Sequence, residues 1–234
     1  MRILGIILAR GGSKGVPGKN IRLLGDKPLL SHSAQVALRC GGLSKSILSS
    51  DDPAIIAVGK EAGLEVPFTR PAELALDHTP TVAVITHAVE FMESVGERFD
   101  AVCLLQPTSP FRTVEFLDAA IAKFIDAGTD SLVSVRRVPH EYNPHWVFEA
   151  SADGTLKIST GEVNIIPRRQ DLPEAYHRDG SIYLSRVSAI KRGTLYGDSI
   201  GYLESPRELY VNIDTEEDWQ KAEQIFKSQA RCAE

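Results

Sequence analysis

Short apolar runs alternate along the chain with longer stretches in which apolar residues recur every three or four positions. The short runs are bounded by polar residues or glycine, a pattern that predicts buried strands. They are Ile3–Leu8, Lys45–Leu48, Ala101–Leu105, Ser131–Val135 and Leu209–Ile213. Strands that alternate with helices are typical of a mainly parallel sheet with helices on both faces. The pattern therefore predicts an α/β fold.

Two of the helical stretches carry signals at their ends. In the first, Thr113 stands where a helix would be capped and Gly128 where it would end. Its predicted buried face is Val114, Leu117, Ala120, Ile121, Phe124 and Ile125. In the second, Thr215 and Asp218 have the spacing of a capping box. Its predicted buried face is Trp219, Ala222, Ile225 and Phe226.

The segment from about 139 to 176 breaks this alternation. It contains four prolines and short alternating pieces around the turn signal "ADG". We interpret it as a β-rich insertion, a hairpin arm of the kind that packs against a second subunit, within a single domain spanning residues 1–234.

Composition narrows the class of protein. The formal net charge of −5 disfavours a general nucleic-acid binder, which would show a basic face. No apolar run reaches the length of a membrane span, and the start of the chain lacks the features of a signal peptide. The three cysteines, Cys40, Cys103 and Cys232, are scattered without CxxC spacing, which indicates a reducing compartment and no zinc site. We expect a cytoplasmic protein.

The first predicted strand is followed by "ARGGSKGVPGKN", residues 9–20. Glycines in a strand-to-helix turn permit positive φ and let backbone N–H groups face an anion, and Arg10, Lys14 and Lys19 add charged donors. The Walker A spacing fails, because Ser13 stands at the first glycine position and Asn20 replaces Ser or Thr, and the dinucleotide fingerprint fails as well. Two interpretations remain open from the loop alone, a phosphate cradle and a glycine-rich surface turn with solvated lysines.

Polar clusters stand at the ends of three other predicted strands: "SSDD" from residue 49, "QPTSPFR" from residue 106 and "NIDTEED", which follows "LYV", from residue 212. In open α/β sheets ligands bind at the carboxyl ends of the strands. The loop would thus meet oxygen ligands from Gln106 and Asp214. A carboxylate beside a phosphate cradle is best explained by Mg²⁺ between them, although Asp214 could also be an acid that simply flanks a helix.

Two arginine-containing stretches remain ambiguous from the residues alone. "RPAELALD" predicts a loop and a short helix with Arg70 at its mouth. "PRRQDLPEAYHRDGSIY" joins Arg168 and Arg169 to Tyr176 and Tyr183. A double arginine suits a carboxylate or phosphate, but a solvated basic turn is equally consistent.

These stretches, together with "DGSIY" and "NIDTEEDW", resemble in collinear order the acylneuraminate cytidylyltransferases, the CMP-sialic acid synthetases. The resemblance implies a Rossmann-like nucleotidyltransferase fold, a homodimer, dependence on Mg²⁺, and transfer of CMP from CTP to an α-keto acid sugar. From the charge and the apolar runs, we expect neither a nucleic acid nor a membrane as a partner.

The resemblance also implies roles for individual residues. The CTP phosphates and nucleoside would be held by Arg10, Gly12, Ser13, Lys14, Lys19, Asn20 and Arg70. The sugar would be held by Gln106, Arg169, Tyr176 and His177, with Arg169 reaching the site from the partner subunit through the arm. The metal would be held by Asp214 and Asn212. Arg10, Lys19 and Asp214 would be the catalytic residues.

Two positions depart from the pattern of that family. Asn212 stands where relatives often carry aspartate, which puts more of the metal binding on Asp214. His177 stands where some bacterial members carry arginine, and "QDLPEAYH" is similar to the synthetases of pseudaminic acid. The sugar is therefore left open within the class, and a nucleotide-binding homologue with weak catalysis, a UTP-dependent transferase and a dehydrogenase remain as alternatives.

Overall fold

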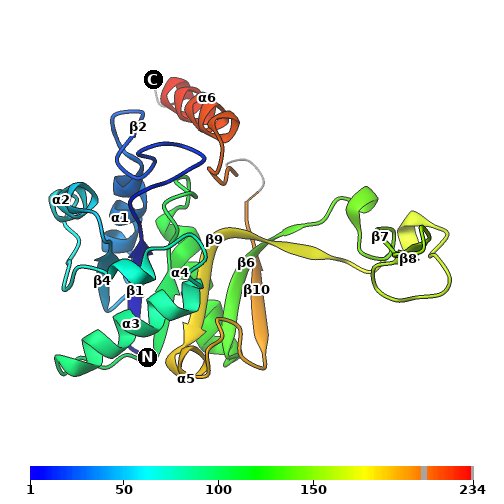
Figure 1. Ribbon diagram of the computed structural model, residues 1–234, viewed down its shortest axis with the longest axis horizontal. Helices are drawn as coiled ribbons and strands as arrows, with labels where there is room; N and C mark the ends of the chain where they lie inside the picture. Colours follow the sequence, from blue (N-terminus) through cyan, green and yellow to red (C-terminus); the bar gives the residue numbers. More distant parts are fainter. Residues whose placement is uncertain (207–209, 233–234) are drawn as a thin grey trace.

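The computed structural model describes residues 1–206 and 210–232, and a six-stranded sheet forms its centre (Figure 1). Across the sheet the strands are β10 (Ile200–Glu204), β6 (Ser131–Arg137), β9 (Tyr176–Arg186), β5 (Ala101–Leu104), β1 (Ile3–Leu8) and β4 (Lys45–Ser49). β9 runs antiparallel to both of its neighbours, and the other pairings are parallel. The prediction of a mainly parallel sheet is confirmed.

Helices cover both faces of the sheet, as predicted. One face carries α1 (Leu29–Arg39), α2 (Pro53–Glu61) and α4 (Val114–Ala127), and the other carries α3 (Thr81–Ser94) and α5 (Val187–Lys191). Alternate residues of β1 serve the two layers, with Ile3 and Ile7 in the first core and Leu4 and Ile6 in the second. This period of two is what a strand buried on both faces requires.

The caps of α4 form as predicted. The Thr113 hydroxyl accepts a hydrogen bond from the Phe116 N–H at 3.1 Å, and Gly128 ends the helix in the left-handed conformation at φ 65°. The predicted face is wrong at Ile125, whose side chain is 44% exposed. Phe116 packs against the core from the first turn of the helix instead.

The predicted strand Leu209–Ile213 is wrong for the part that the structure describes, and Leu209 lies outside the described residues. Val211 and Ile213 are buried, but they pack against α6 (Glu216–Cys232) instead of joining the sheet. The Ile213 N–H donates to the Thr108 carbonyl at 2.9 Å, which ties this segment to the loop after β5. Val211 and Ile213 are therefore buried alternately because this irregular segment packs against α6 and the loop after β5, and not because it is a strand.

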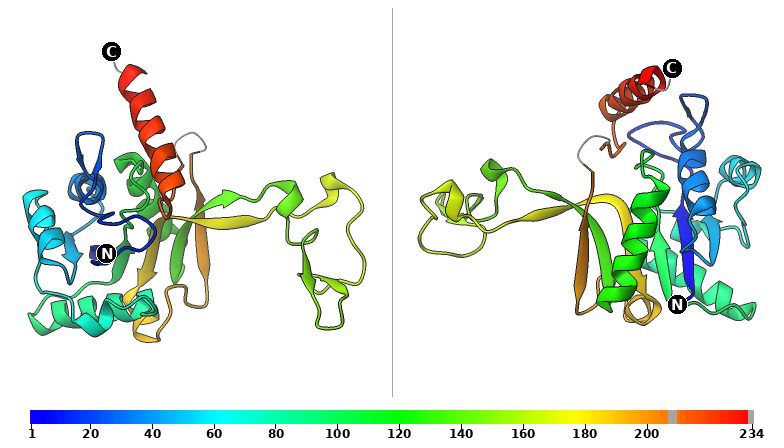
Figure 2. Two further views of the ribbon diagram at one scale, coloured as in Figure 1. Left: turned by 45° about the horizontal axis from the view of Figure 1, so that its top comes forward. Right: turned by 180° about the vertical axis from the view of Figure 1, so that it is seen from behind.

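α6 closes the top of the molecule above the glycine-rich loop (Figures 1 and 2). Its predicted capping box forms, because the Asp218 N–H donates to the Thr215 hydroxyl at 3.2 Å and the Thr215 N–H donates to Asp218 Oδ2 at 3.0 Å. The fully buried Trp219 anchors the helix in a third core, which also contains Val16 and Leu24. The C-terminal helix thus holds the loop between β1 and the short hairpin of β2 (Leu23–Leu24) and β3 (Lys27–Pro28).

The segment between β6 and β9 extends away from the sheet as an arm (Figure 2). It contains the two-stranded ribbon of β7 (Phe148–Ala150) and β8 (Leu156–Ile158), with the single turns η2 (His140–Tyr142) and η3 (Arg169–Asp171). Its role in dimerisation stays a prediction. Within the described part of the chain, no helix has the length and apolar character that a membrane crossing requires.

Candidate active site

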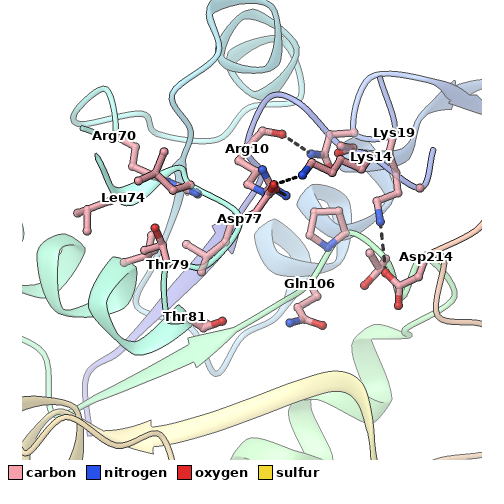
Figure 3. A pocket seen from close by; sticks show the side chains of 18 of the residues that line it. Arg10, Lys14, Lys19, Arg70, Leu74, Asp77, Thr79, Thr81, Gln106 and Asp214 are labelled. Atoms are coloured by element: carbon pink, nitrogen blue, oxygen red, sulfur yellow. Dashed lines mark hydrogen bonds and ion pairs between the residues drawn. The ribbon is translucent and has the colours of Figure 1, made fainter. Parts of the chain in front are cut away.

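A cavity of about 520 Å³ opens at the carboxyl ends of β1 and β5 (Figure 3). It is lined by Leu8, Arg10, Ser13, Lys14, Gly15, Lys19, Asn20, Arg70, Leu74, Leu76, Asp77, Thr79, Thr81, Val84, Gln106, Pro107, Thr108, Asn212 and Asp214. Four segments that are distant in sequence thus meet at one edge of the sheet, where α/β folds bind their ligands.

The glycine-rich loop forms one wall of the cavity. Gly12 and Gly18 adopt φ values of 66° and 63°, which the loop needs in order to turn back on itself. A Cβ at Gly15 would collide with the backbone carbonyl oxygen of Asp214, so only glycine allows this close approach. The expectation of a strand-to-helix turn is wrong, because the hairpin β2–β3 separates the loop from α1.

The outer end of the cavity is cationic. Arg10 Nη2 lies 2.6 Å from Asp77 Oδ1, and Lys14 forms an ion pair with the other oxygen of the same carboxylate. The contact with Lys14, and after it the contact with Arg10, lowers the pKa of Asp77. Arg10 and Lys14 thus converge on the carboxylate of Asp77. The same two side chains are donors of the kind that bind phosphate groups.

Lys19 and Asp214 lie together at the wall nearest α6 (Figure 3). Lys19 Nζ donates to the Ile213 carbonyl at 2.7 Å and lies 3.4 Å from Asp214 Oδ1. The Lys19 side chain is mostly buried, whereas Asp214 is largely exposed to the cavity. Asn20 is buried and donates from Nδ2 to the Arg10 carbonyl at 3.1 Å, which fixes the two ends of the loop relative to each other.

Arg70 enters the cavity from the opposite side, just before the turn η1 (Ala72–Leu74). Its Nε donates to the Ser49 hydroxyl at 3.0 Å and its Nη2 to the Ser49 carbonyl at 2.5 Å. Burial is the main cause that lowers the pKa of Arg70, to about 10. The guanidinium is therefore charged at neutral pH and rigidly held at the end of β4.

Uncharged polar groups form the floor of the cavity. Gln106 follows β5, and the buried Arg112 donates from Nη2 to the Gln106 carbonyl at 3.1 Å. Asn212 Nδ2 donates to Asp214 Oδ2 at 2.6 Å. Among the described residues Asn212 Oδ1 is buried without a hydrogen-bond partner, which is a rare state for a polar atom. Gly180 lies beside it and gives both amides the space to approach.

The structure brings most of the predicted site together but not all of it. Gly12 lines a small hollow of about 50 Å³ behind the loop and does not line the main cavity. Arg169, Tyr176 and His177 are also absent from the cavity lining within this chain. Arg169 belongs to the arm, and Tyr176 stacks on Tyr202 at the base of the arm with ring centroids 4.9 Å apart.

Sequence reasoning missed several residues that line the cavity. Asp77 is the last residue of "RPAELALD", a stretch in which the sequence pattern indicates a role for Arg70 alone. Thr79 and Thr81 follow directly and line the same wall. The signal that could have identified Asp77 is chemical: an acid in a stretch expected to approach Arg10 and Lys14 would pair with them.

Comparisons with known proteins identify relatives over almost the whole chain. Residues 4–231 match the cytidylyltransferase family. The chain is 33% identical over 228 residues to pseudaminic acid cytidylyltransferase of Campylobacter jejuni, with 97% of each chain covered. It is 32% identical over 234 residues to CMP-N,N'-diacetyllegionaminic acid synthase of Legionella pneumophila, again over 97% of each. It is also 33% identical over 224 residues to N-acylneuraminate cytidylyltransferase A of Danio rerio, covering 95% of this chain and 50% of the fish protein.

Solved structures give the fold independently of sequence. CMP:2-keto-3-deoxy-manno-octonic acid synthetase superposes with a TM-score of 0.72 at 17% identity, covering 98% of this chain and all of the other. The 4-diphosphocytidyl-2C-methyl-D-erythritol synthase of Anaerococcus prevotii gives 0.65 at 14% identity, covering 97% and 96%. The Rossmann-like nucleotidyltransferase fold is thereby confirmed.

Proposed function

The chain belongs to the cytidylyltransferase family, and we propose that it transfers CMP from CTP to the anomeric hydroxyl of a nonulosonic acid, a nine-carbon α-keto acid sugar, releasing pyrophosphate. The observation that carries the proposal is the division of one cavity into a cationic end and an uncharged polar floor. The first suits a triphosphate and the second a polyhydroxylated sugar.

The cationic end would bind the nucleotide. Arg10, Lys14 and Lys19, with the backbone around Ser13, would hold the triphosphate and then the leaving pyrophosphate. On the opposite wall, the rigid Arg70 would contact the nucleoside, and Asn20 would keep the loop in its binding shape. Little covalent work falls to the protein, because positioning and charge stabilisation dominate phosphoryl transfer.

The sugar would occupy the floor beside Gln106. Its anomeric oxygen would attack the α-phosphorus in line, so that one P–O bond forms, the bond to the pyrophosphate breaks, and the hydroxyl proton is released. Lys19 would stabilise the charge that develops on the phosphate oxygens, since it is largely shielded from water.

The residues at this wall fit Mg²⁺ carried in with the nucleotide. Mg²⁺ takes oxygen ligands and is typically held by one or two carboxylates together with substrate phosphates. Asp214 supplies an exposed carboxylate, and Asn212 supplies a buried amide oxygen that has no partner among the described residues. When bound, the ion would neutralise charge at the α-phosphate and lower the pKa of the attacking hydroxyl.

We also propose that the enzyme is a homodimer in which the arm reaches the partner's cavity. Apolar side chains of the arm are exposed, among them Leu156 at 64% and Val163 at 94%. Arg169, Tyr176 and His177 would then contribute to sugar binding across the interface. Lys19→Met and Arg169→Ala should each lose activity as separate proteins. Mixing them should restore part of it, because a mixed dimer contains one complete site. No recovery after exchange of subunits would contradict the arrangement.

The function is tested by pyrophosphate release with CTP and Mg²⁺ against a panel of sugars. The panel contains pseudaminic acid, legionaminic acid, N-acetylneuraminic acid, its deaminated relative and Kdo. Release with a nonulosonic acid, and with CTP in preference to UTP, would support the proposal and identify the sugar. CTP binding without release for any sugar would favour a nucleotide-binding homologue with weak catalysis.

A further inference from the structure

The carboxylate of Asp77 forms ion pairs with Arg10 and Lys14, the two cations at the outer end of the cavity. It comes from the loop between α2 and α3, 67 residues from Arg10 in the chain. One oxygen lies 2.6 Å from Arg10 Nη2, and the other pairs with Lys14 (Figure 3). Two oxygens of one anion therefore engage two donors, as two phosphate oxygens would.

A triphosphate and Asp77 cannot both hold these donors at full strength. Arg10 and Lys14 supply two positive charges, and Asp77 already neutralises one of them. A polyphosphate placed beside a retained carboxylate would face like-charge repulsion. Asp77 and a polyphosphate would therefore compete for Arg10 and Lys14.

The loop that carries Asp77 can shift, and so break the ion pairs with Arg10 and Lys14, at a small cost in free energy. Arg70 anchors its beginning through the Ser49 contacts and through its N–H, which donates to the Ser50 carbonyl at 2.8 Å. Its end is anchored where α3 begins at Thr81. Between these anchors, Leu76 and Asp77 are exposed, so a local shift removes little buried apolar surface.

We propose that Asp77 is a built-in anion that sets the affinity of the site for polyphosphates: its carboxylate pairs with Arg10 and Lys14, and nucleotide binding is an exchange of one anion for another. The inference rests on the proposed function only in taking the ligand to be a polyphosphate. The apparent affinity is the intrinsic one reduced by the fraction of molecules in which Arg10 and Lys14 are released. The same carboxylate would return to the cations after pyrophosphate leaves.

The test replaces Asp77 with asparagine, which keeps the shape and removes the charge. Each contact is an ion pair at least partly open to solvent, so freeing both should tighten binding by roughly twofold to thirtyfold. Binding of CTP and of inorganic tripolyphosphate is measured by calorimetry for the wild type and Asp77→Asn. The gain should shrink at high salt, because screening weakens the competing pairs. Cytidine, which has no phosphate, should bind both proteins equally.

Glu73→Gln is the matched control. Glu73 lies in the same loop and is exposed, and within the described residues its carboxylate makes no ion pair. It removes the same charge, so it should leave tripolyphosphate affinity near that of the wild type. Equal or weaker polyphosphate binding by Asp77→Asn, or an equal gain from Glu73→Gln, would overturn the exchange. Turnover is measured separately, and exchange without CMP transfer would contradict the proposed function while supporting the role of Asp77.

Discussion

Replacing Lys19 with methionine removes a mostly buried charge from the cavity wall. The Lys19 side chain is 13% exposed, and its Nζ lies 2.7 Å from the Ile213 carbonyl and 3.4 Å from Asp214 Oδ1. Loss of one preorganised donor to a developing charge costs about 10²–10³ in turnover. Loss of the hydrogen bond from this charged donor to the Ile213 carbonyl should cost about 1.5–3 kcal/mol of folding stability, less than the total stability of a typical domain. We therefore expect a large loss of activity in a protein that remains folded.

The assay is kcat and KM for CTP, measured by pyrophosphate release, together with urea unfolding. Lys19→Arg should retain more activity than Lys19→Met, because it keeps the charge but changes the geometry. Lys27→Met is the matched control, since Lys27 contacts Gln35 on the surface and does not line the cavity. Near wild-type turnover in Lys19→Met would refute the role given to this lysine.

Three further changes test the structure. Gly15→Ala should abolish activity and lower stability, because its Cβ would collide with the Asp214 carbonyl; full activity in that variant would disprove the close approach. Burial, and after it the contact with Asp118, raises the pKa of Cys40 to about 12, and burial also raises the pKa of Cys103. Both thiols should therefore resist DTNB until the chain unfolds. Fast labelling of either thiol in a Cys232→Ser background would contradict this. Burial lowers the pKa of His32 from its ordinary value of 6.5. The unfolded state therefore binds more protons than the folded state as the pH drops through that value, and stability should fall. An unfolding free energy that changes with pH equally in the wild type and in His32→Gln would exclude this cause.

The central strands could be predicted because their neighbours bury both faces. Ile3–Leu8 is a continuous apolar run, and its alternate residues enter two different cores. β9 was missed because its outer half, at the base of the arm, is polar and includes His177 and Arg178. β10 was missed because it lies at the edge, where Ile200 and Tyr202 remain exposed. For such strands the sheet order supplies information that local pattern does not.

The same distinction separates the site residues. Arg10, Lys19, Gln106 and Asp214 could be predicted because each follows a run expected to be buried, although Asp214 reaches the site from a packed loop and not from a strand. Asp77 was not singled out, because its pairing with Arg10 and Lys14 follows only once the two segments are known to approach each other in the fold. The arm residues remain predictions, because Arg169, Tyr176 and His177 do not line the cavity of their own chain and the role proposed for them involves a second subunit.

The most direct measurement of the central claim is identification of the product. The protein is incubated with CTP, Mg²⁺ and either pseudaminic or legionaminic acid, and the mixture is examined by ³¹P NMR and mass spectrometry. We predict a phosphodiester that links CMP to the anomeric carbon, formed together with an equal amount of pyrophosphate. Unreacted CTP with every nonulosonic acid, or CMP formed without a sugar attached, would contradict it.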